Sequence, residues 1–159
     1  MHKHLTTIFL LSLFSIALYS TDLDLDDIIA NTDDKPIFLF FHKPHCGHCS
    51  HMIEFTLKDD EIKDEIDAKF IYVDLYTKET GVVTYRDFKG SRREFAQYLG
   101  YDFYPTSIFL DPKGNVVNAT PGAREQDYFI NVLDYVSTQQ YRDMEFETYL
   151  DTLDFNSDS

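Results

Sequence analysis

Apolar and polar positions in this 159-residue chain follow two different periods. The run from Pro36 to Phe41 has almost no polar position, which is typical of a strand buried on both faces of a helix-covered sheet. Phe129, Val132, Leu133 and Val136 fall at i, i+3, i+4 and i+7, so they predict a helix with one apolar face. The alternation of strands and helices predicts an α/β fold with parallel pairing and right-handed crossovers.

The same patterns predict the remaining elements. Further helices are expected over residues 22–30, 47–57, about 58–66, 93–99 and 146–153, and further strands over 70–75, 107–110 and 115–119. The last two strands are separated by Asp-Pro-Lys-Gly, which is turn chemistry, so they should form an antiparallel hairpin. The segment 81–90 is expected to form either a small hairpin or an ordered loop.

The first 20 residues have the character of a targeting segment. Lys3 precedes an apolar stretch from about Leu5 to Tyr19 that ends in small residues, which predicts a secretory signal peptide over 1–20, cleaved near 17–20. A retained membrane anchor is the alternative, but the apolar run is shorter than the ~20 residues that a spanning helix needs. The protein is therefore expected in the periplasm, with one domain over 21–153 and a disordered tail over 154–159.

The charge of the chain excludes one class of function. Removing residues 1–20 takes away only Lys3, so 14 basic residues become 13 against 28 acidic ones and the net charge moves from −14 to −15. A nucleic-acid-binding protein needs the opposite sign. The acids lie within 22–34, 59–67 and 143–158, and are most simply solvated faces or tails that keep the protein soluble.

Both cysteines stand in one tetrad, Cys46-Gly47-His48-Cys49, between a predicted strand and a predicted helix. A structural bridge is a poor explanation, because cysteines three apart close a very small loop and remove little entropy from the unfolded chain. A Cys-x-x-Cys pair that opens a helix is instead typical of a redox dithiol.

The position of each cysteine predicts its role. Cys46 should lie at the N-terminal end of the helix, where unpaired N–H groups and the helix dipole favour a thiolate, so it is the expected nucleophile. Cys49, one turn further on, is the expected resolving thiol. His48 lies inside the redox loop and is expected to stabilise the Cys46 thiolate. His42, His45 and His51 could either tune the site or be surface polar groups.

The order of elements resembles the thioredoxin fold over about residues 22–140, with Tyr104-Pro105-Thr106 before the hairpin and Gly122 after it. The Cys-Gly-His-Cys tetrad and the Tyr-Pro-Thr tripeptide are similar to those of protein disulfide isomerases. The resemblance implies a central mixed sheet flanked by helices, with Pro105 in cis beside the cysteines as part of the catalytic site. Tyr104, Thr106 and His45 are then the expected substrate-binding residues, with Tyr104 pairing to an extended substrate strand.

A closer resemblance is to the SoxW-like periplasmic thioredoxins. The shared features are Phe41-x-x-Pro-x-Cys46 with Met52, an insertion near 78–90, and a C-terminal helical extension with the pattern Tyr-x-x-Met-x-Phe-x-x-Tyr-Leu over 141–150. Two positions depart from the thioredoxin pattern. His45 replaces the usual tryptophan before the first cysteine, and Phe40 replaces the buried carboxylate that relays the proton of the second thiol.

These residues predict an exported thiol-disulfide oxidoreductase, more specifically a reductase, with no cofactor beyond the redox-active Cys46–Cys49 disulfide. Its expected partners are disulfide-containing proteins and a membrane electron-transfer thiol protein, and it is expected to be a monomer. The alternative is a metallochaperone of thioredoxin fold, in which the cysteines and histidines bind copper or zinc. A binding module without activity is disfavoured because both cysteines are present.

Overall fold

The structure is a computed structural model that describes residues 22–157 of the chain. The predicted signal peptide, 1–20, lies outside the described residues. Within 22–157 no helix is both long enough and apolar enough to cross a membrane.

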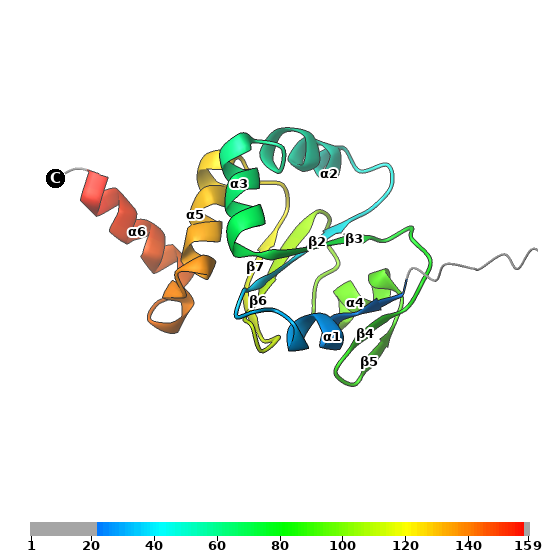
Figure 1. The fold of residues 1–159 in the computed structure, drawn as a ribbon. Coiled ribbons are helices and arrows are strands. Elements are labelled where there is room, and N and C mark those ends of the chain that lie inside the picture. The colour runs from blue at the N-terminus through cyan, green and yellow to red at the C-terminus, as the bar shows by residue number, and fades with distance from the viewer. Residues whose placement is uncertain (1–21, 158–159) are drawn as a thin grey trace, which may run out of the picture.

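A four-stranded mixed sheet forms the centre of the molecule, in the order β3-β2-β6-β7 (Figure 1). Its strands are β2 (Ile37–His42), β3 (Ile71–Tyr76), β6 (Thr106–Leu110) and β7 (Val116–Pro121). β2 pairs parallel with β3 and antiparallel with β6, and β6 pairs antiparallel with β7. The predicted thioredoxin fold, with its mixed sheet flanked by helices, is confirmed.

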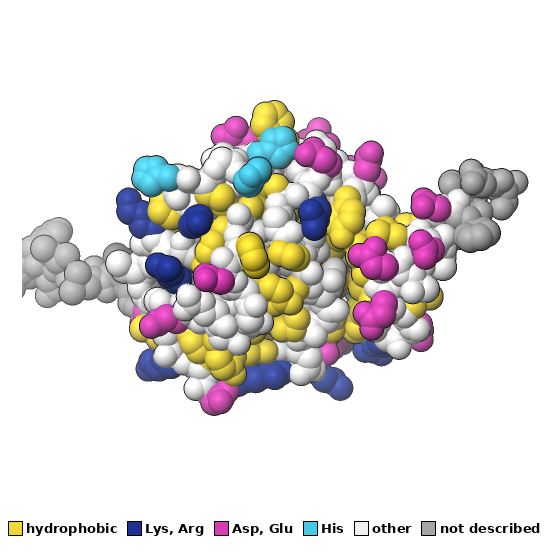
Figure 2. Space-filling view, turned by 180° about the vertical axis from the view of Figure 1, so that it is seen from behind, with side chains coloured by type: hydrophobic (Ala, Val, Ile, Leu, Met, Phe, Trp, Pro, Cys, Tyr) yellow, Lys and Arg dark blue, Asp and Glu magenta, His cyan; other side chains and the backbone are white. Residues whose placement is uncertain are grey.

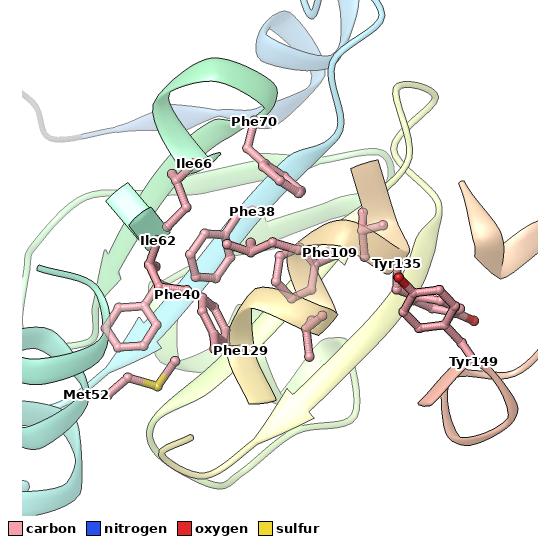
Figure 3. Close-up of a cluster of buried hydrophobic side chains, with 13 residues drawn as sticks. Phe38, Phe40, Met52, Ile62, Ile66, Phe70, Phe109, Phe129, Tyr135 and Tyr149 are labelled. Atoms are coloured by element: carbon pink, nitrogen blue, oxygen red, sulfur yellow. The ribbon is translucent and has the colours of Figure 1, made fainter. Parts of the chain in front are cut away.

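Helices cover both faces of this sheet. The central strand β2 contributes apolar side chains to both faces, since successive side chains of a strand point to opposite sides. Phe38 and Phe40 face an aromatic cluster beneath α3 (Asp60–Lys69) and α5 (Gln126–Ser137), which is drawn in Figure 3. Leu39 and Phe41 face a second cluster beneath α1 (Leu25–Ala30) and α4 (Arg92–Tyr98). All five residues from Ile37 to Phe41 are fully buried, as the unbroken apolar run predicted.

A second, three-stranded sheet accounts for the insertion. β1 (Leu23–Asp24) pairs parallel with β4 (Val83–Tyr85), and β4 pairs antiparallel with β5 (Phe88–Gly90). The segment 81–90 is therefore a hairpin rather than a loop. The Arg86 backbone N–H at its turn donates to the Asp26 carboxylate at 2.9 Å, which ties the hairpin to α1.

Three predicted boundaries are corrected. The opening helix begins at Leu25 rather than at Asp22, because the side chain of Asp24 caps it and the preceding residues pair with β4. The expected helix 47–57 divides into the α-helix α2 (Gly47–His51) and the π-helix η1 (Met52–Thr56). The last helix, α6 (Phe146–Ser157), continues past residue 153 into the segment expected to be disordered, since no Gly or Pro interrupts it.

The C-terminal extension packs on α5 rather than on the sheet. The short 3₁₀ helix η2 (Gln140–Arg142) turns the chain, and α6 follows (Figure 1). The hydroxyl of Tyr149 donates to Asp134, and that of Tyr135 donates to the carbonyl of Met144 at 2.7 Å. Burial, together with the neighbouring Asp134 carboxylate, raises the pKa of Tyr149 to about 12. The extension is therefore anchored by buried tyrosines.

Candidate active site

The two cysteines lie at the start of α2, immediately after the loop that leaves β2. They form a disulfide with an S–S distance of 2.10 Å and a Cα–Cα distance of 5.2 Å. Cys46 is the N-cap of α2, and its Sγ accepts a hydrogen bond from the Cys49 backbone N–H at 3.2 Å. Cys46 is partly accessible, whereas only 2% of Cys49 is exposed. The first sulfur can meet a substrate, and the second cannot do so without a change in the site.

The loop before β6 faces the first sulfur. The Sγ of Cys46 lies 3.8 Å from the carbonyl oxygen of Tyr104, a contact rather than a hydrogen bond because a disulfide sulfur carries no proton. The Tyr104–Pro105 peptide bond is cis, as the resemblance implies. Gly122 holds this loop from the other side, since its N–H donates to the Pro105 carbonyl at 2.8 Å. The cis-proline loop therefore lies between Cys46 on one side and Gly122 on the other.

Thr106, one of the residues expected to bind substrate, lies beneath the surface of the site. Thr106 has no exposed surface, and its hydroxyl donates to the Phe103 carbonyl at 2.7 Å. This hydrogen bond holds the loop that carries Phe103 and Tyr104. Phe103, by contrast, is 72% exposed and offers an apolar surface beside Tyr104.

Two of the expected site histidines lie on the surface around the disulfide. His45 and His48 are both exposed, and His45 has a φ of 55°, a left-handed conformation between Pro44 and the first cysteine. His51 is engaged elsewhere, since its Nε2 lies 3.1 Å from a carboxylate oxygen of Glu125. The structure thus leaves His45 and His48 free to face a substrate, while His51 links α2 to the start of α5.

The position beneath the second cysteine is apolar. Phe40, which replaces the carboxylate of the thioredoxin pattern, is fully buried in the aromatic cluster together with Met52 from η1 (Figure 3). The residue directly across from Phe40 in the register is Asp74 of β3. Its Oδ1 lies 2.6 Å from Nε2 of His42, whose ring stacks on Phe40 with centroids 5.4 Å apart. A carboxylate is therefore present on this face, but one strand away.

The cysteines and histidines do not assemble a metal site. Across the described residues, no three His, Cys, Asp or Glu side chains are grouped so that they could hold a metal ion. The physical reason is that residues 42, 45, 48 and 51 diverge over a strand end, a loop and a helix, and two of them bind carboxylates separately. The metallochaperone alternative is not supported.

Two features of the site were missed from the sequence. The π-helix η1 follows α2 directly, and its backbone is held by side chains at the start of α5, with Gln126 Nε2 donating to the Phe55 carbonyl at 3.0 Å. Lys43 is the second, because its Nζ lies 5.3 Å from the centre of the Tyr104 ring. The only signal for Lys43 was its place between a buried strand and the cysteines.

Comparison with known proteins agrees with this geometry. Residues 23–137 match the family described as "Thioredoxin-like domain". A curated relative, "Protein disulfide isomerase-like 2-2" from rice, is 29% identical over 108 residues. That match covers 67% of this chain but spans only about a quarter (25%) of the length of the relative.

Solved structures show the same fold at low sequence identity. A thioredoxin-fold protein from Helicobacter pylori superposes with a TM-score of 0.65 at 22% identity, covering 75% of this chain and 84% of the other. The C-terminal domain of DsbD from Neisseria meningitidis, in its oxidised form, superposes with a TM-score of 0.52 at 20% identity, covering 69% and 87%.

Proposed function

The chain belongs to the family of thioredoxin-like domains, and from this premise we propose that it is an exported reductase of protein disulfides that works through Cys46 and Cys49. The observation that carries the proposal is the unequal exposure of two cysteines at disulfide distance, with the accessible one facing the Tyr104 carbonyl. The similarity to a protein named as a disulfide isomerase supports the same class of chemistry.

The reaction begins from the reduced form of the pair. The Cys46 thiolate attacks one sulfur of the substrate disulfide, a Cys46–substrate bond forms, and the other substrate sulfur leaves with the electron pair. The Cys49 thiolate then attacks the Cys46 sulfur and releases the second substrate thiolate. Two electrons pass to the substrate, and the protein ends with the Cys46–Cys49 disulfide seen in the structure.

Substrate contacts are proposed around the first cysteine. An extended substrate segment would pair with the backbone of Tyr104 beside Pro105, and exposed Phe103 would cover its apolar side chains. His48, in the first turn of α2, would stabilise the Cys46 thiolate, and His45 would face the substrate.

The proton of Cys49 needs an acceptor that Phe40 cannot supply. We propose the Asp74 carboxylate acting through His42, because these two side chains are hydrogen-bonded and lie on the same face of the sheet as Phe40. Proton transfer through a hydrogen-bonded pair is ordinary general acid–base chemistry.

The cellular setting is proposed from the sequence. A signal peptide over 1–20 would place a monomeric protein in the periplasm, where a membrane thiol protein would return electrons to the Cys46–Cys49 disulfide. The SoxW-like features suggest reduction of partner disulfides in that compartment.

Insulin reduction tests the proposal. The wild-type protein, supplied with a dithiol reductant, should reduce insulin disulfides well above the rate of the reductant alone. Cys46→Ser should abolish this increase, because the remaining cysteine, Cys49, is buried and cannot reach a substrate disulfide. When Cys49→Ser is first reduced and then freed of the reductant, it should instead accumulate a mixed disulfide with insulin, detectable as a heavier band on a non-reducing gel. Equal activity of Cys46→Ser and wild type would overturn the proposal.

A further inference from the structure

A polar pocket of about 520 Å³ borders the cis-proline loop. Three basic side chains line it, Lys43, Lys78 and Arg93, together with Asp102 and Tyr104. The basic residues come from three separate segments: the loop after β2, the loop after β3, and the first turn of α4. Their convergence is therefore a product of the fold and cannot be seen as a charge run in the sequence.

The pocket adjoins the reactive sulfur through one shared residue. Tyr104 lines the pocket with its side chain, and its carbonyl oxygen lies 3.8 Å from Cys46 Sγ. Lys43 lies over the Tyr104 ring. Burial and the Asp102 carboxylate raise the pKa of the Tyr104 hydroxyl, and Arg93 acts in the opposite direction. The pocket is therefore close enough to Cys46 for one substrate to reach both with its disulfide and a neighbouring group.

The basic residues of the pocket are not neutralised by ion pairs. Among the described residues, Lys43, Lys78 and Arg93 have no carboxylate within 4.0 Å, and Asp102 is the one acid in the lining. The adjacent Arg92 contrasts with them, since it is buried and paired with Glu79 at 2.6 Å. Figure 2 shows dark blue side chains beside the cyan histidines, while magenta side chains gather toward the C-terminal end.

This local charge opposes the charge of the whole molecule. With 28 acidic residues against 14 basic ones, the protein as a whole repels anions. A cleft lined by one sign of charge concentrates ligands of the opposite sign. Three basic side chains beside the sulfur of so acidic a protein therefore point to an anionic substrate.

We propose that this pocket binds a carboxylate next to the substrate disulfide, so that Cys46 reacts preferentially with disulfides that carry negative charge. The inference rests on the proposed exchange function. The carboxylate would come from an acidic residue beside a substrate cysteine or from a small anionic disulfide such as glutathione disulfide.

The test isolates the first step of exchange. In a Cys49→Ser background the Cys46 thiolate attacks a probe disulfide, the probe S–S bond breaks, one probe thiolate leaves, and the mixed disulfide accumulates for measurement by mass. Three probes of similar size differ in charge: dithiodipropionate is anionic, bis(2-hydroxyethyl) disulfide is neutral, and cystamine is cationic. The rates are compared before and after Lys43→Gln, Lys78→Gln and Arg93→Gln are combined.

Removing the three charges should slow the anionic probe about tenfold relative to the neutral one, and should speed the cationic probe. The neutral probe corrects for any change in the thiolate itself, since such a change alters all three rates together. Differences among leaving thiols cancel because each probe is compared with itself. Added salt should reduce the anionic preference of the unsubstituted pocket.

A matched control combines Lys89→Gln, Lys113→Gln and Arg142→Gln. These three residues are exposed, do not line the pocket, and change the net charge by the same amount. The control should leave the ratio of anionic to neutral rates within twofold. An equal loss in the control and the pocket variant would overturn the inference.

The outcomes separate the inference from the function on which it rests. Reaction with all three probes but no pocket-dependent preference overturns the inference alone, whereas no reaction with any probe overturns the proposed function. Glutathione disulfide and a pair of cystine peptides, with the cysteine flanked by Glu or by Gln, then identify the source of the carboxylate. A pocket-dependent preference for the Glu peptide assigns it to protein substrates, and one confined to glutathione disulfide assigns it to a small molecule.

Discussion

The two cysteines are only three residues apart, yet their surroundings differ in exposure and in polarity. Around Cys46 the chain places a backbone carbonyl, exposed histidines and a pocket with three basic side chains. Cys49 is itself buried, and the helix after it continues into buried Met52 and the aromatic cluster that contains Phe40. Under the proposed function, substrates would be selected on the Cys46 side of the disulfide, and the apolar Cys49 side would exclude water.

The largest effect is expected when a carboxylate is introduced on the apolar side, at Phe40. Phe40→Asp should destabilise the protein by at least about 4 kcal/mol, because it removes a buried aromatic ring and leaves a carboxylate in an apolar cluster. Urea unfolding followed by circular dichroism measures the loss.

Phe40→Leu is the matched control, since it keeps an apolar side chain and should cost about 1 kcal/mol. The deficit of Phe40→Asp should also be smaller at pH 4 than at pH 8, because burial raises the pKa of the new carboxyl and its neutral form is less costly to bury. A loss below about 2 kcal/mol at pH 8 would contradict the apolar character assigned to this side.

Asp74→Asn tests whether the His42–Asp74 pair, on the same face of the sheet as Phe40, accepts the proton of Cys49. The substitution keeps the shape of the side chain that contacts His42 but removes its charge, so release of the mixed disulfide at neutral pH should slow by on the order of 10²-fold. Rapid-quench measurement of product release across a pH series checks this.

The pH series distinguishes proton transfer from a structural role. At alkaline pH, where solvent can remove the proton of Cys49, the variant should approach the wild-type rate. Asp64→Asn removes the same charge from the exposed face of α3 and should have little effect at any pH. A loss that persists unchanged to high pH would show that Asp74 supports the fold instead.

His48→Ala tests the accessible side of the disulfide, where His48 is proposed to stabilise the Cys46 thiolate. If His48 stabilises the Cys46 thiolate it stabilises the reduced form, so its removal should make the reduction potential about 30 mV more negative, equivalent to about 1.4 kcal/mol. The wild-type potential should lie between those of thioredoxin and DsbA, about −270 and −120 mV. Equilibration with glutathione buffers measures both.

His51→Ala is the control for this substitution, because the His51 ring is already hydrogen-bonded to Glu125. It should leave the potential within a few mV, a shift that corresponds to only about 0.2 kcal/mol. An unchanged potential in His48→Ala, or a wild-type value at or below that of thioredoxin, would remove the histidines from the chemistry of the site.

Features fixed by local pattern were predictable from the sequence. The uninterrupted apolar run at 36–41 gave the buried central strand, and the spacing of Phe129 to Val136 gave the apolar face of α5. The cysteine pair was found for the same reason, since its spacing and its place before a helix are properties of one short segment.

Features that depend on distant partners were not predictable in this way. The pairing of β1 with β4 joins residues about 60 positions apart, and no periodicity marks it. The complete burial of Thr106 is a second example, because it depends on the pairing of β6 with β2 and not on the residues next to Thr106 in the chain. The basic pocket is the clearest case, because its two lysines and its arginine come together only when two loops and a helix are assembled.

The sulfur proposed to attack the substrate is also the cap of the helix behind it. Cys46 Sγ accepts the Cys49 backbone N–H, and α2 is only five residues long before the π-helix begins. A cap contributes about 1 kcal/mol to the helix that it closes. Each change in the bonding of this sulfur therefore alters how often the start of α2 opens. The rate of amide hydrogen exchange at Cys49 should then report whether the cysteine pair is oxidised or reduced.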